Sequence, residues 1–100
     1  MSWKAQYEQF GTWHDMHFTS INVDARPGGL IKATGQDEVG QFVFEGSFSP
    51  HNPECRIHKQ YSGKHAIYYQ GKVDTQTGAI DGSWGFQPGD SNGGFKMRKE

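Results

Sequence analysis

Turn-forming residues recur along the whole chain and leave no segment long enough for a crossover helix. Seven such stretches come every ten to fourteen residues: WHDM, RPGG, GQDEVG, SPHNPE, YSGKH, DTQTG and QPGDSNGG. Gly, Pro, Asn and Asp at this spacing are typical of hairpins between short strands. The turns predict an antiparallel meander of eight strands, in residues 5–13, 16–25, 30–35, 41–49, 55–61, 65–73, 79–86 and 94–98.

The composition agrees with a folded, all-β domain. The chain has one leucine and 14 glycines in 100 residues, which disfavours helices. It also has 14 aromatic residues and a net charge of only −1, whereas disordered chains combine few apolar residues with high charge. We therefore expect a single domain over residues 1–100.

Glycine falls on the apolar side of three expected strands, at Gly46, Gly71 and Gly82. A glycine inside a strand weakens it unless the sheet bends sharply or a bulky neighbour approaches closely. We interpret these glycines as room for large aromatic side chains inside a tightly coiled sheet. Closure would also remove the two exposed edges of an open eight-stranded sheet. The predicted architecture is a small closed barrel, with a two-sheet β-sandwich as the alternative.

A short motif near the start adds a family resemblance. Gly11, Thr12 and Trp13 lie in the first expected strand and precede a series of up-and-down hairpins. This arrangement resembles the lipocalin and avidin barrels, in which a Gly-x-Trp near the start places the tryptophan as a plug at one barrel end. The resemblance implies an up-and-down barrel over the whole chain that binds small molecules inside, without specifying a ligand. We expect Trp13 and Trp84 to be buried.

The meander brings alternate turns to the same end of the barrel. The turns near residues 14, 37, 63 and 90 would share one mouth, and those near 27, 51 and 76 would share the other end with both termini. Inward polar groups above an aromatic floor are typical of a ligand pocket. Alternation predicts that the ligand-binding residues at the first mouth are His17, Lys59, Tyr61, His65, Tyr69, Trp84 and Phe86.

Three classes of function follow from this arrangement. The leading hypothesis is a barrel that binds a small polar or aromatic molecule at that mouth. The first alternative is a ligand-free interaction or structural module. The second is a small enzyme that uses His17, His65, Lys59 or Tyr61 as acid or base. We expect no catalytic cysteine, because Cys55 and His58 would point to opposite faces of one strand.

Other partners are not expected. The near-zero net charge offers no long-range attraction for nucleic acid. The chain begins without the apolar run of a signal peptide and has no stretch of about 20 apolar residues, so we expect a cytoplasmic protein without membrane contact. His14, His17 and His65 match no strong metal-binding signature, so neither metal nor other cofactor is predicted. The sequence leaves the oligomeric state open.

Overall fold

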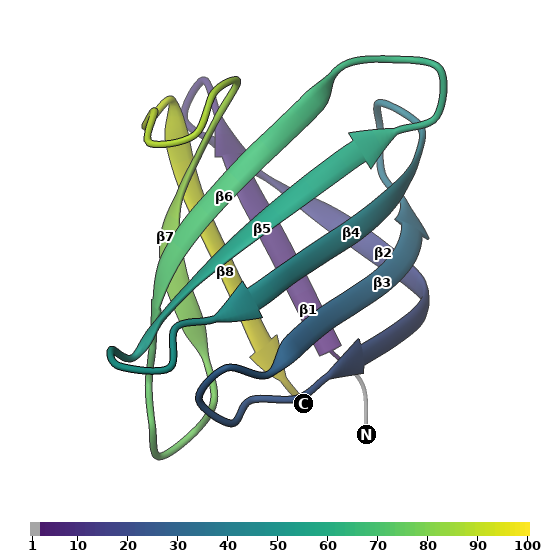
Figure 1. Ribbon diagram of the computed structural model, residues 1–100. Coiled ribbons are helices and arrows are strands. Elements are labelled where there is room, and N and C mark those ends of the chain that lie inside the picture. Colours follow the sequence, from purple (N-terminus) through teal and green to yellow (C-terminus); the bar gives the residue numbers. More distant parts are fainter. Residues whose placement is uncertain (1–2) are drawn as a thin grey trace.

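The computed structural model describes residues 3–100 as eight strands that close into a barrel (Figure 1). The strands are β1 (Trp3–Gln9), β2 (Thr12–Val23), β3 (Leu30–Gln36), β4 (Gln41–Phe48), β5 (Glu54–Tyr61), β6 (Ala66–Val73), β7 (Ile80–Gly85) and β8 (Gly93–Lys99). Each pairs antiparallel with its neighbours in sequence, and β8 pairs with β1. The predicted all-β class, meander order and closure are confirmed, which excludes the two-sheet sandwich.

The first turn lies four residues earlier than predicted. The chain reverses at Phe10 and Gly11, whose φ angles are 53° and 78°, and β2 begins at Thr12. A two-residue turn with both φ angles positive matches the right-handed twist of antiparallel strands. The prediction of a turn at His14 and Asp15 is therefore wrong, because those residues lie within β2.

A bulge in β2 reverses the predicted orientation of His17. The register between β2 and β3 shifts between Phe18 and Ser20. An extra residue at a bulge changes which alternate positions face inward. Met16 is therefore buried before the bulge and Ile21 packs against the core after it, while His17 is exposed. The prediction that His17 points into the barrel is wrong.

The two tryptophans expected to be buried have different environments. Trp84 is only 6% exposed, and its Nε1 donates a 2.6 Å hydrogen bond to the carbonyl oxygen of Glu8. Trp13 is 41% exposed and lies under the ammonium of Lys96, 4.2 Å from the ring centroid. Trp13 is therefore not the interior plug that the resemblance implies.

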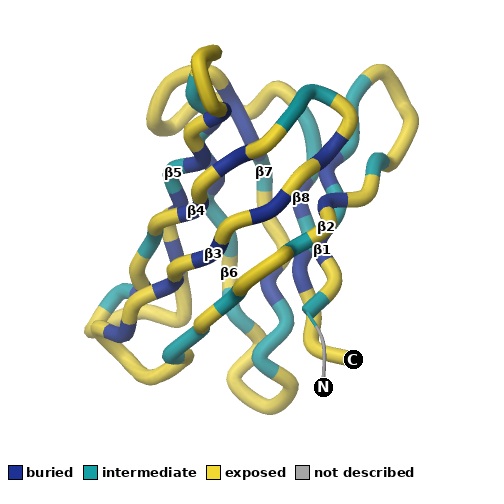
Figure 2. The backbone as a smooth tube through the Cα atoms, turned by 90° about the vertical axis from the view of Figure 1, so that its right-hand side faces the viewer, coloured by how far each residue is buried: buried dark blue, intermediate teal, exposed yellow. Residues whose placement is uncertain are grey.

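Side chains fill the barrel, and buried and exposed positions alternate along its strands (Figure 2). Aromatic rings from different strands pack against one another in the core; Phe95, for example, lies 4.4 Å from Tyr69, centroid to centroid. The buried apolar side chains are Ala5, Tyr7, Met16, Ile31, Ala33, Phe42, Phe44, Phe48, Cys55, Ile57, Tyr61, Ile67, Tyr69, Ile80, Trp84, Phe95 and Met97.

The strand glycines make room for neighbouring backbone rather than for aromatic rings. A Cβ at Gly82 would collide with the backbone of Gln70 and Gly71 on β6, and Gly71 is its register partner. A Cβ at Gly46 would meet the carbonyl oxygen of Arg56 and the side chain of Ile57. These glycines permit close approach of adjacent strands, which a tightly coiled sheet requires. The interpretation that they accommodate aromatic side chains is therefore wrong at these positions.

Candidate functional site

The barrel has two structurally different ends (Figure 1). We call the end formed by the β1–β2, β3–β4, β5–β6 and β7–β8 turns the mouth, which is uppermost in Figure 1. We call the opposite end, where β1 begins and β8 ends, the base. Just below the mouth, the interior contains a polar cluster built around Lys59.

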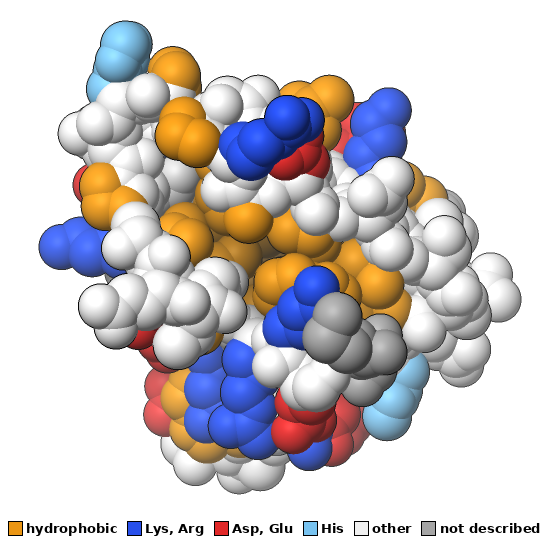
Figure 3. Space-filling model, turned by 90° about the horizontal axis from the view of Figure 1, so that it is seen from below, with side chains coloured by type: hydrophobic (Ala, Val, Ile, Leu, Met, Phe, Trp, Pro, Cys, Tyr) orange, Lys and Arg blue, Asp and Glu red, His pale blue; other side chains and the backbone are white. Residues whose placement is uncertain are grey.

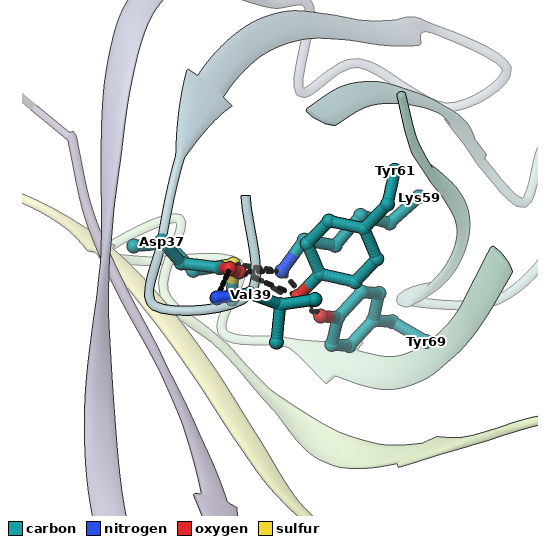
Figure 4. A network of polar contacts seen from close by, with 6 residues as sticks. Asp37, Val39, Lys59, Tyr61 and Tyr69 are labelled. Atoms are coloured by element: carbon teal, nitrogen blue, oxygen red, sulfur yellow. Dashed lines mark hydrogen bonds and ion pairs between the residues drawn. The ribbon is translucent and has the colours of Figure 1, made fainter. Parts of the chain in front are cut away.

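Lys59 is an inward residue of β5 with no exposed surface. Its ammonium forms an ion pair with the carboxylate of Asp37 (Figure 4). It also lies 3.3 Å from Met16 Sδ and donates a 3.2 Å hydrogen bond to the hydroxyl of Tyr69. Its charged group therefore contacts side chains from two other strands, β2 and β6, and from the β3–β4 turn.

Asp37 lies in the β3–β4 turn, and its side chain is fully buried. Besides Lys59, its carboxylate accepts a 2.6 Å hydrogen bond from the hydroxyl of Tyr61 and a 2.9 Å bond from the N–H of Val39. Among residues 3–100, every buried side-chain nitrogen or oxygen atom has a hydrogen-bond partner. Such full pairing is what makes a buried charge tolerable.

Four aromatic rings surround the Lys59 ammonium. Its Nζ lies 4.4 Å from the centroid of Phe42, 4.6 Å from Tyr61, 5.1 Å from Tyr7 and 5.7 Å from Tyr69. Aromatic faces attract cations at such distances. Burial nevertheless lowers the pKa of Lys59 to about 8, although the neighbouring Asp37 acts in the opposite direction.

The pKa values of the buried tyrosines are raised, whereas that of Lys59 is lowered. Burial, together with the charge of Asp37, raises the pKa of Tyr7 to about 12. The same two causes raise the pKa of Tyr61 and of Tyr69. All three phenols therefore remain neutral hydrogen-bonding groups at physiological pH.

A small cavity of about 50 Å³ lies between this cluster and the outside. The ring of Phe86 meets those of Trp84 and His65 there, with centroids 5.5 and 5.9 Å away. The hydroxyls of Tyr61 and Tyr69 form hydrogen bonds within the cluster. The hydroxyl of Tyr7 forms none within residues 3–100; since every fully buried polar side-chain atom there is paired, this oxygen keeps accessible surface, and Tyr7 lines the cavity. The cavity is lined by Tyr7, Gln9, Val39, Tyr61, His65, Ile67, Tyr69, Trp84 and Phe86.

The structure brings six of the seven predicted site residues to the mouth. Five of them line the cavity: Tyr61, His65, Tyr69, Trp84 and Phe86. Lys59 lies behind the cavity wall, bonded to Tyr69. His17 is the exception, because it is exposed on the outer face.

His14 occupies the position near the mouth that was expected for His17. Its ring stacks on Tyr7 with centroids 5.2 Å apart, and its Nδ1 lies 3.1 Å from Glu38. The sequence interpretation also missed Tyr7 as a site residue and Asp37 as the partner of Lys59. Ala5 and Tyr7 are two residues apart and therefore face the same side of β1. With the first turn placed at Gly11, this alternation predicts that Tyr7 points inward.

The base contains a larger hollow of about 410 Å³ among three turns. Seen from below, apolar side chains gather around a depression there (Figure 3), and Pro27, Phe48 and Val73 are among its lining residues. Two of its polar side chains bond within their own turns: Ser49 accepts from the N–H groups of His51 and Asn52, and Asp74 accepts from those of Gln76 and Thr77. His51, Asn52, Glu54 and Thr75 also line the hollow. The buried ion pair of Lys59 and Asp37 lies at the mouth, at the other end of the barrel.

No metal centre emerges from the described part of the chain. Within residues 3–100, no three His, Cys, Asp or Glu side chains are grouped so that they could hold a metal ion. No helix in this range is long and apolar enough to cross a membrane.

Comparison with known proteins adds no relative. No family model, no curated protein and no solved structure matches the chain. The closed eight-stranded antiparallel barrel is consistent with lipocalin and avidin topology, and the resemblance rests on that topology.

Proposed function

We propose that the protein binds a small molecule at the mouth, with an aromatic or other planar group directed toward Tyr7 and Tyr69. The observation that carries this proposal is the unpaired hydroxyl of Tyr7 beside a cavity walled by aromatic rings. Ligand sites typically combine apolar walls with a few polar groups that fix orientation. Here Trp84 and Phe86 provide the walls, and the tyrosine hydroxyls provide the polar groups.

The size of the cavity limits the ligand. A volume of about 50 Å³ holds only a few water molecules, since one needs at least about 10–15 Å³. A ring-sized ligand must therefore displace side chains at the entrance. Phe86 is 50% exposed and His65 is also exposed, so both can turn outward with little loss of packing.

The Lys59–Asp37 ion pair supports the site from behind. A buried ion pair is often no more stabilising than apolar side chains of similar volume. Ionisable groups with perturbed pKa values beside a cavity are candidates for functional roles. Lys59 bonds the hydroxyl of Tyr69 and Asp37 bonds that of Tyr61, so the pair fixes two rings that line the cavity.

The direct test is native mass spectrometry of protein purified from its own host, followed by titration of any compound that is retained. We expect a small molecule to co-purify. Its affinity should fall about tenfold in Tyr7→Phe, the effect of losing one hydrogen bond to a ligand. Tyr68→Phe is the matched control, because Tyr68 lies on the outer face, and it should bind normally.

Two results would contradict the proposal. One is a retained compound whose affinity is unchanged in Tyr7→Phe. The other is protein that retains nothing and binds no member of a library of small aromatic and polar compounds, which would favour the ligand-free interaction module.

A further inference from the structure

A second concave surface lies on the outside of the barrel, away from the mouth cavity. We call it the outer groove; it has a volume of about 540 Å³ and is bounded by β4, β5, β6 and the β7–β8 loop. Figure 1 shows these three strands side by side. The side chains that matter below are Glu45, Arg56, His58, Tyr68, Gln70 and Asp90.

The strand register arranges the floor of this groove in two rows. Glu45 pairs with His58, and His58 pairs with Tyr68. The rings of His58 and Tyr68 lie 5.1 Å apart, centroid to centroid. In the second row Arg56 pairs with Gln70. The floor therefore presents an aromatic pair beside several planar polar groups.

The β7–β8 loop forms one wall of the groove. Tyr68 is paired with Gly85 on β7, and Asp90 lies so close to Gly85 that a Cβ there would collide with it. Gly85 therefore allows the loop to fold against the outer face, where Pro88 and Asp90 border the groove. A convex barrel surface becomes a concave one at this place.

The charged and amide groups of the outer groove are not engaged by the protein. The ion pairs of residues 3–100 are His14–Glu38, Asp24–Arg26, Asp37–Lys59 and Arg98–Glu100. Glu45, Arg56 and Gln70 make no side-chain hydrogen bond to another described residue either. Their donors and acceptors are available to a bound molecule.

We infer that the outer groove binds a short neutral oligosaccharide. A pyranose ring has an apolar C–H face that packs on an aromatic ring, and its hydroxyls both donate and accept hydrogen bonds. Tyr68 and His58 supply the aromatic surface. The carboxylates of Glu45 and Asp90 can accept hydrogen bonds, and the guanidinium of Arg56 can donate them. The amide of Gln70 can do both. Together these groups can bond to adjacent sugar hydroxyls, which both donate and accept. The volume of about 540 Å³ lies within the usual range for ligand sites, about 300–1,000 Å³.

The same features disfavour other classes of ligand. Two carboxylates, Glu45 and Asp90, stand beside one guanidinium, Arg56, which does not suit nucleic acid or another polyanion. A peptide cannot add a strand, because the closed barrel has no free edge. A purely apolar ligand would bury the unpaired polar groups at a cost.

The test is titration of isotope-labelled protein with maltotriose, cellotriose and triacetylchitotriose, followed by amide chemical shifts. We expect at least one of them to bind saturably with a Kd on the order of 1 mM or lower. The shifted amides should cluster in residues 45–47, 56–58, 68–70 and 88–90. Tyr68→Ser and Arg56→Gln should each weaken binding about tenfold, the effect of losing one good contact.

Two control variants separate this site from others. Arg98→Gln removes an exposed guanidinium on β8, outside the groove, and should bind as the wild type does. Tyr7→Phe alters the mouth and should also leave the affinity for the sugar unchanged, so the two sites can fail independently. If Tyr68→Ser does not fold, Arg56→Gln alone tests the site, because Arg56 is exposed and its replacement should not disturb folding. The inference is overturned if no trisaccharide saturates, if the shifts fall outside the groove, or if a sulfated oligosaccharide binds more tightly than the neutral ones.

Discussion

Removing either member of the Lys59–Asp37 pair should destabilise the barrel strongly. Both side chains are fully buried, so neither charge can be solvated when its partner is lost. Breaking a buried ion pair by removing one partner costs about 3–5 kcal/mol. After Lys59→Met, Asp37 keeps the hydroxyl of Tyr61 and the N–H of Val39 as donors, so we expect the lower end, about 3 kcal/mol.

Asp37→Asn should have the larger effect. The amide oxygen of asparagine can still accept from the ammonium of Lys59, and Met16 and Tyr69 remain beside it, but no negative charge balances the buried ammonium. We expect a loss of about 4 kcal/mol, a large part of the 5–15 kcal/mol typical for a domain of this size. The double variant removes both charges, so it should lose no more than about 4 kcal/mol, giving a coupling free energy of at least about 3 kcal/mol.

The assay is urea-induced unfolding at pH 7, followed by tryptophan fluorescence, for the wild type and the three variants. The exposed pair Asp24–Arg26 is the matched control, and its coupling should be far weaker because solvent screens both charges. Additive effects of the Lys59 and Asp37 substitutions would refute the reasoning, because independent side chains do not share a buried ion pair.

Four further outcomes can be checked by unfolding measurements. Trp84→Ala should cost about 3–5 kcal/mol because the side chain is buried, and a loss below about 1 kcal/mol would contradict its core position. Gly82→Val should destabilise by at least about 2 kcal/mol, since its Cβ would collide with the β6 backbone; a stabilised variant would refute that packing. Phe10→Asn should raise the free energy of unfolding by about 0.5–1 kcal/mol, because Phe10 is 97% exposed and has a φ of 53°, which asparagine adopts more readily. A lower free energy of unfolding would indicate that the Phe10 ring makes a stabilising contact. The pKa of Lys59 is lowered to about 8 in the folded state, so stability should rise from pH 8 to about 9. Burial raises the pKa of Cys55 to about 11, which should cancel this gain between pH 9 and 10, and the raised pKa of Tyr7, about 12, should make stability fall above pH 10. A stability that rises steadily from pH 8 to 12 would contradict these shifts.

The fold was predictable because the turn residues are evenly spaced and the strands alternate. From β3 onward, every predicted strand lies within one residue of the observed ends. Alternation also placed Lys59 and Trp84 inside correctly. Closure followed from general physics, since an open sheet of this composition would leave edges and one face exposed.

The errors come from features that alternation cannot reveal. The turn at Phe10 and Gly11 contains an aromatic residue with a positive φ, which sequence rules disfavour, whereas His14 and Asp15 look like a turn. The bulge after Phe18 then reversed the inferred orientation of His17. Both depend on pairing with other strands rather than on the local sequence.

The sequence alone also could not identify Asp37 as the partner of Lys59. Asp37 is the first residue of the β3–β4 turn, where a carboxylate usually faces solvent or caps the turn. It does bond the N–H of Val39, but it also folds inward to Lys59 on β5. The two positions are 22 residues apart, and the pairing of β3 with β4 and of β4 with β5 brings them together.

The most direct test of ligand binding at the mouth is an NMR fragment screen of labelled protein with small aromatic and polar compounds. The account predicts hits whose amide shifts cluster in residues 7–9, 61–69 and 84–86, around the cavity of Tyr7 and Trp84. Hits confined to the base hollow, in residues 25–27, 48–54 and 73–78, would contradict it. So would a screen in which every hit binds only the outer face of β4, β5 and β6.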